Sequence, residues 1–143
     1  MDLVIGIGNR LRKDDGIGPA LVEALGSTPG VECHVVHQLT PDLALRLSEA
    51  DRLLFVDASI DGTEIALERI EPARGHGVAH AMSPSAFLDF AAAVVEAIPP
   101  AWLLTVPGHD FGIGERLSPE ARSRLPEAVR RAQAWLASAT VTV

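Results

Sequence analysis

The chain has a single cysteine, Cys33, among its 143 residues. A lone cysteine excludes a disulfide within the chain and a metal site built from several thiolates. Because Cys33 lies in the strand predicted over 31–37, we expect a small buried residue there rather than a nucleophile. The sequence also lacks the patterns H-E-x-x-H and G-x-S-x-G, so it predicts neither a zincin-type site nor the nucleophile turn of a serine hydrolase.

Positive charge is scarce, with 12 Lys and Arg against 19 Asp and Glu and a net charge of −7. This balance argues against nucleic acid and anionic lipid as partners. The sequence shows no basic-then-apolar leader and no apolar run long enough to cross a bilayer. We therefore expect a cytoplasmic protein, a monomer, that binds neither nucleic acid nor a membrane.

The remaining composition is that of one folded domain. Hydrophobic residues make up 48% of the chain and charged residues 22%, and no repeat or low-complexity linker divides it. We expect a single domain spanning residues 1–143 with a sizeable core.

Short apolar runs alternate with segments of helical spacing along the chain. The runs predict strands over 3–7, 31–37, 51–57, 65–70 and 102–106. The helical spacing predicts helices from about 15 to 25, 40–48, 83–98 and 118–137. This order predicts an α/β three-layer sandwich, a mainly parallel twisted sheet of about five strands with helices on both faces. The strand over 65–70 carries interspersed polar residues, so we place it near an edge.

The stretch V-I-G-I-G-N-R-L-R-K-D-D-G-I-G-P, residues 4–19, carries the first candidate site. It places Asp14 and Asp15 just beyond the first strand, at the edge where open α/β sheets bind ligands. A dinucleotide site would need a third glycine where Leu11 stands. One of the two carboxylates can serve as a helix N-cap. The other then remains to bind a cation or a substrate group.

Asp57 closes the third predicted strand, and His80 shortly precedes the helix that begins near Ser83. If the first and third strands are neighbours, Asp15 and Asp57 meet at one edge. With His80 they would form a three-ligand site for a divalent ion that leaves room for substrate. Taken singly, Asp57 also suits a turn at a strand end, and His80 an ordinary surface loop.

The run G-I-G-N-R-L-R-K-D-D-G-I-G resembles the N-terminal signature of the hydrogenase maturation proteases. These endopeptidases trim the C-terminal tail of nickel-containing hydrogenase large subunits. The resemblance extends over nearly the whole chain, including F-V-D-A at Asp57 and L-S-P before the last helix. It implies a metal-dependent, aspartate-containing endopeptidase in which Asp15, Asp57 and His80 are both the catalytic and the metal-binding residues. His76 competes with His80 for the third place, and His80 is favoured because it lies nearer the helix.

The resemblance also implies the partner and the metal. The substrate would be a hydrogenase large-subunit precursor, whose own nickel the three residues contact in place of a permanent zinc. If that metal polarises the scissile carbonyl, Asp14 or Asp15 is the nearest base in sequence. His109 and Asp110 fit either the cleft or a structural loop. A non-proteolytic nickel-protein recognition or assembly chaperone on the same fold, and a peptidase acting on another precursor, remain as alternatives.

Overall fold

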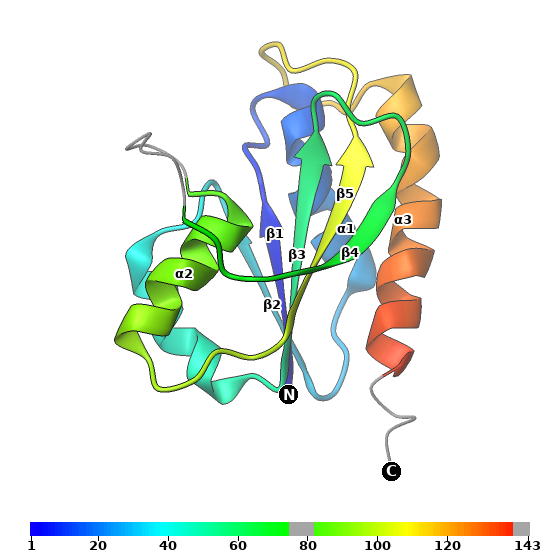
Figure 1. Cartoon of the computed structure of the whole chain (residues 1–143). Helices are drawn as coiled ribbons and strands as arrows, with labels where there is room; N and C mark the ends of the chain where they lie inside the picture. Colours follow the sequence, from blue (N-terminus) through cyan, green and yellow to red (C-terminus); the bar gives the residue numbers. More distant parts are fainter. Residues whose placement is uncertain (75–81, 139–143) are drawn as a thin grey trace.

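The computed structural model describes residues 1–74 and 82–138. Within these residues the chain forms one five-stranded sheet in the order β2-β1-β3-β5-β4 (Figure 1). The strands are β1 (Asp2–Ile7), β2 (Val31–Val36), β3 (Arg52–Ser59), β4 (Ala66–Ile70) and β5 (Ala101–Pro107). All neighbours pair in parallel except β4, which runs antiparallel to β5 at one edge. The predicted α/β class and the edge position of the fourth strand are both confirmed.

Helices cover both faces of the sheet. The helical segments of the described chain are η1 (Lys13–Gly16), α1 (Ile17–Leu25), η2 (Pro41–Glu49), α2 (Pro84–Val94) and α3 (Pro119–Ser138), where η marks a 3-10 helix. α1 and α3 pack on one face, and α2 and η2 on the other (Figure 1). None of the helices in residues 1–74 and 82–138 is long and apolar enough to span a membrane.

The three layers follow from alternating side chains along the central strands. In β1, Leu3 and Ile5 join the core under α2 and η2, whereas Val4 joins the core under α1 and α3. β3 repeats this pattern, with Phe55 on the first side and Leu54 on the second. A parallel strand buried on both faces needs apolar residues at successive positions, which accounts for the uninterrupted runs in the sequence.

Three helix predictions need correction. The segment predicted as a helix over 40–48 is 3-10 rather than α-helical, and its buried residues Ala44 and Leu47 are three apart, the spacing of one face of a 3-10 helix. α1 begins at Ile17, after the separate turn η1, rather than at 15 or 16. α2 ends at Val94, because Val95 already has an extended backbone.

Candidate active site at the carboxyl edge of the sheet

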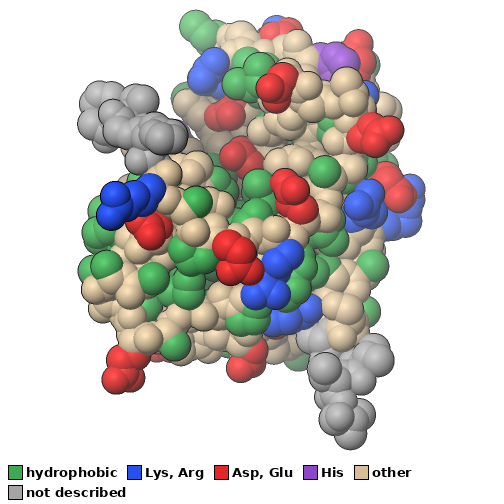
Figure 2. All heavy atoms as spheres, in the orientation of Figure 1, with side chains coloured by type: hydrophobic (Ala, Val, Ile, Leu, Met, Phe, Trp, Pro, Cys, Tyr) green, Lys and Arg blue, Asp and Glu red, His purple; other side chains and the backbone are tan. Residues whose placement is uncertain are grey.

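Asp15 and Asp57 lie together at the carboxyl edge of the parallel strands. Asp57 is in β3, and Asp15 is in η1, which follows β1, the parallel neighbour of β3. The two side chains are close enough for the negative charge of Asp15 to act on the pKa of Asp57. Acidic side chains are visible near the upper ends of β1 and β3 in Figure 2. The structure thus brings together two of the predicted site residues, whereas His80 and its competitor His76 lie outside the described residues.

Asp57 occupies a setting that opposes its charge. Burial raises the pKa of Asp57 to about 6; the N–H of Ala58, which donates to its Oδ1 at 2.8 Å, acts against the rise, and the charge of Asp15 adds to it. β3 continues to Ser59, two residues beyond Asp57, so the alternative of a turn at the strand end is wrong. A bound cation would stabilise the ionised forms of Asp57 and Asp15, because it compensates both negative charges.

Asp15 is fixed by its own loop rather than by the helix that follows. Its Oδ2 accepts a hydrogen bond from the N–H of Asn9 at 2.6 Å, and it makes no cap of η1 or α1. Gly8, at φ +152°, packs so closely that a Cβ there would overlap the carbonyl oxygen of Asp15. The close approach explains why the turn after β1 needs glycine. The helix-cap alternative is therefore wrong for Asp15.

Asp14, the other aspartate of the pair, is an internal anchor. Its side chain is completely buried. It accepts hydrogen bonds from the backbone N–H groups of His109 (2.7 Å), Asp110 (3.0 Å) and Ser118 (2.7 Å), and from the Ser118 hydroxyl (2.6 Å). Burial alone would raise the pKa of Asp14, but the bonds from Ser118, His109 and Asp110 outweigh it and leave the pKa below its ordinary value. An ionised carboxylate with this many donors holds a loop in place and is unsuited to act as a base.

These bonds attach the loop between β5 and α3, residues 108–118, to the segment that carries Asp15. Asp110 adds an ion pair with Lys13, Nζ to Oδ2 at 2.8 Å. The ring Nε2 of His109 accepts a hydrogen bond from Arg124 at 2.8 Å. His109, Asp110 and Lys13 also line a cavity of about 730 Å³ beside the loop. His109 and Asp110 thus stabilise the loop and border a cavity at this edge.

The donor set suits a divalent cation in part. Carboxylate oxygens bind such ions, and an imidazole beside them would favour a borderline metal such as nickel. In residues 1–74 and 82–138, no group of three histidine, cysteine or acidic side chains is placed to hold a metal. A three-ligand site here therefore needs a residue from outside these ranges, where the predicted ligand His80 falls.

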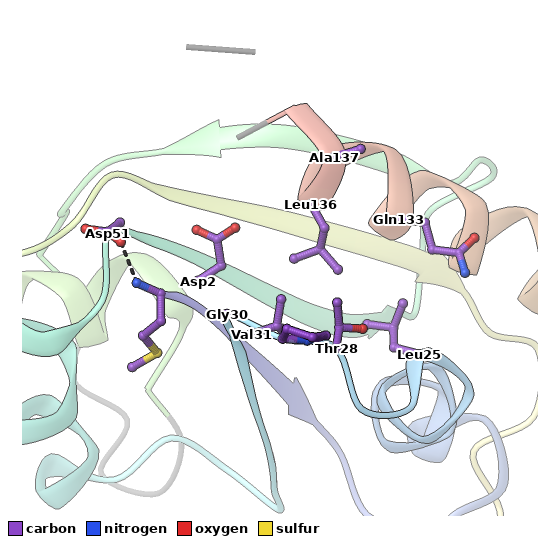
Figure 3. Close-up of a pocket in the computed structure, with 11 residues that line it drawn as sticks. Asp2, Leu25, Thr28, Gly30, Val31, Asp51, Gln133, Leu136 and Ala137 are labelled. Carbon is purple, nitrogen blue, oxygen red and sulfur yellow. Dashed lines mark hydrogen bonds and ion pairs between the residues drawn. The ribbon is translucent and has the colours of Figure 1, made fainter. Parts of the chain in front are cut away.

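Two other features lie outside the candidate site. A cavity of about 510 Å³ lies at the amino ends of the strands, away from Asp57 (Figure 3). Its acidic groups are paired, Asp51 with the chain's amino group and Asp2 with Arg52. Cys33 is half-buried rather than fully buried, and burial, followed by the charge of Glu32, raises the pKa of its thiol and so favours the protonated form.

Solved structures with the same fold are known. The hydrogenase maturating endopeptidase HybD from E. coli superposes with a TM-score of 0.76 and 21% identity over 96% of this chain and 93% of its own. The chain has the fold of the hydrogenase maturation endopeptidases. The [NiFe] hydrogenase maturation protease HycI from Thermococcus kodakarensis KOD1 gives a TM-score of 0.70 and 20% identity over 92% of this chain and 88% of its own. The hydrogenase 2 maturation peptidase of a Thaumarchaeota archaeon gives a TM-score of 0.70 and 22% identity over 95% of this chain and 97% of its own.

No protein-family model and no curated protein matches the sequence. At about one identical residue in five, these structures establish the fold, and the function must be argued from the residues of this chain.

Proposed function

We propose that this protein is an endopeptidase that removes a short C-terminal peptide from the nickel-loaded precursor of a hydrogenase large subunit. The observation that carries the proposal is the pairing of Asp15 with Asp57 at the carboxyl edge of the sheet. Its fold is shared with hydrogenase maturation endopeptidases, and the paired carboxylates stand at the edge where such sheets bind ligands.

In this proposal the nickel belongs to the substrate. Asp15 and Asp57 offer it carboxylate oxygens, and His80 supplies the third ligand. The chain between His80 and α2 is short, since α2 begins at Pro84. Alternation along β3 also puts Asp57 on the side of the sheet that Phe55 occupies, which is the side that α2 covers. A ligand just before α2 therefore suits a site that includes Asp57.

Hydrolysis then needs a base beside the docked peptide bond. Asp14 is excluded because its oxygens are occupied by the loop. We assign the role to Asp15: its Oδ2, which accepts from the N–H of Asn9, also serves the nickel, and its Oδ1 accepts a proton as water adds to the scissile carbonyl carbon. The same proton passes to the leaving nitrogen as the C–N bond breaks, so the carboxylate is regenerated. The substrate's nickel fixes the peptide bond relative to this group, which is the main benefit of a docked geometry.

The test is cleavage of the nickel-loaded precursor by the wild type and by Asp15→Asn, Asp57→Asn and His80→Ala. We expect each variant to lose at least about a thousandfold in rate, since each removes a group that contacts the reacting centre. Asp89→Asn, an exposed carboxylate on α2, is the matched control and should cleave at the wild-type rate. Binding of the precursor without cleavage by the wild type would instead support a nickel-protein chaperone.

A further inference from the structure

Two exposed apolar side chains lie at the rim of the candidate site. Leu11 is 57% exposed and Ile113 is 94% exposed. Their segments pair in parallel at the bridge between Arg12 and Gly114, with hydrogen bonds from Gly114 N–H to Leu11 O (2.9 Å) and from Lys13 N–H to Gly114 O (2.8 Å). The bridge holds the segments of Leu11 and Ile113 next to each other, and both side chains are exposed. Together they make up a small apolar patch.

The backbone that presents this patch is strained at Lys13 and is firmly held. Lys13 has a φ of +45°, which a residue with a side chain rarely adopts. Gly114 has a φ of +152°, and a Cβ on it would lie 3.1 Å from the Lys13 side chain. Beneath the patch, Asp14 fixes both segments through its hydrogen bonds. Strain of this kind persists where the surroundings enforce it and is concentrated at functional sites. Two exposed apolar side chains add little stability, so stability does not account for the strain at Lys13.

A basic group without a carboxylate partner accompanies the patch. Arg10 and Lys13 are paired with Glu23 (2.5 Å) and Asp110 (2.8 Å). Arg12 instead donates only to a backbone oxygen, that of Phe111 at 3.2 Å, and no carboxylate in the described part of the chain pairs with it. Acidic and basic side chains are interspersed over the face in Figure 2, and the chain as a whole is acidic. The exposed guanidinium of Arg12 is open to pairing with a carboxylate from outside the chain.

A cavity adjoins the patch. About 520 Å³ in volume, it is lined by Leu11, Asn9 and Lys13 together with His37 at the end of β2. Such a hollow beside exposed apolar groups can receive a side chain of a partner. Asn9 is also the residue whose N–H holds Asp15, so the cavity and the candidate catalytic group share one loop.

We propose that Leu11, Ile113 and Arg12 form a docking surface for the precursor, here called the rim patch. The rim patch receives an apolar side chain of the precursor next to one of its acidic groups, in the segment that adjoins the scissile bond. This inference rests on the proposed function. The rim patch is small, which suits a transient enzyme–substrate contact better than a permanent interface. A contact between the precursor and the rim patch, away from the scissile bond, supplies binding energy that positions that bond in the site.

The experiment measures kcat and KM for cleavage of the nickel-loaded precursor by Leu11→Glu, Ile113→Glu and Arg12→Glu. We expect KM to rise about tenfold for each, with kcat within about twofold of wild type. The reason is that each variant loses a contact that is equally strong in the bound substrate and in the transition state. Leu45→Glu and Val94→Glu are the matched controls: these apolar residues are 69% and 50% exposed, on η2 and α2, and should leave both constants unchanged. An unchanged KM in the rim variants, or an equal rise in the controls, overturns the proposal.

Failure of the proposed function is separable from failure of the rim patch. If the wild type binds the precursor but does not cleave it, the affinities of wild type and Leu11→Glu for the precursor are compared directly. If Leu11→Glu binds the precursor more weakly than wild type does, the rim patch is supported, and if the two affinities are equal, it is overturned. Light scattering gives the remaining check. A wild-type dimer that dissociates in Leu11→Glu would assign the patch to a second copy of the chain and overturn the proposal.

Discussion

Asp14 and Asp57 are both withdrawn from water, with opposite effects on their pKa. Asp14 accepts four hydrogen bonds, and its pKa lies below the ordinary value. Asp57 accepts one from the adjacent N–H, and its pKa is raised to about 6. The number of donors, rather than burial itself, decides which carboxylate is stable as an anion. A poorly compensated charge is characteristic of a functional group.

Asp57→Asn should therefore stabilise the metal-free protein at neutral pH. The folded-state pKa exceeds the ordinary value of 3.8, so ionisation of Asp57 opposes folding. The cost is absent below about pH 4, grows up to about pH 6 and is complete above it. We expect the free energy of unfolding of Asp57→Asn to exceed that of wild type by about 1 to 3 kcal/mol at pH 8.

Urea unfolding at pH 4 and pH 8, with chelator present, measures this difference. It should vanish at pH 4. A variant less stable than wild type at pH 8 would mean that Asp57 serves the fold.

At the scale of elements, the loop between β5 and α3 is attached to the loop that carries Asp15. Asp14 bonds to both ends of residues 109–118, and the N–H of Asp14 donates to the carbonyl of Asp110 at 2.9 Å. Ser118, which donates to Asp14, also caps α3 by accepting from the N–H of Ala121. The buried carboxylate of Asp14 thus holds together η1, the loop and the start of α3.

Asp14→Asn should destabilise the protein by about 2 to 4 kcal/mol at pH 7, because an amide cannot accept from all four donors. The folded-state pKa of Asp14 lies below the ordinary 3.8, so this stability is present above pH 4 and is lost as the pH falls further. Hydrogen exchange should quicken in residues 108–118 while β1 and β3 remain protected. Uniform exchange across the chain would contradict a local anchor.

The sequence predicts much at this scale, but not this anchor. Alternating apolar runs located the five strands, and placing the first and third strands side by side brought Asp15 and Asp57 to one edge, as the structure has them. The role of Asp14 had no local signal, since its partners are 95 to 104 residues away. The 3-10 form of η2 was also missed, because a short amphipathic segment fits either helix. The assignment of His80 stays a prediction.

Over the whole molecule, the two ends of the sheet differ in role. At the amino ends, Arg52 pairs with Asp2 at 2.7 Å and lies 3.9 Å from the ring centre of Trp135, which joins β1, β3 and α3. At the carboxyl ends lie Asp57 in β3, Asp15 in η1 and the rim patch. The cluster around Arg52 and the groups proposed for catalysis are thereby separated by the length of the strands.

The most direct test of the account is intact-mass measurement of a large-subunit precursor incubated with the wild-type protein, once loaded with nickel and once free of it. We predict that the nickel-loaded precursor loses a single C-terminal peptide and that the nickel-free precursor stays intact. Equal cleavage of both forms would contradict recognition of the substrate's metal by Asp15 and Asp57. An intact nickel-loaded precursor after prolonged incubation would contradict the proposed endopeptidase activity itself.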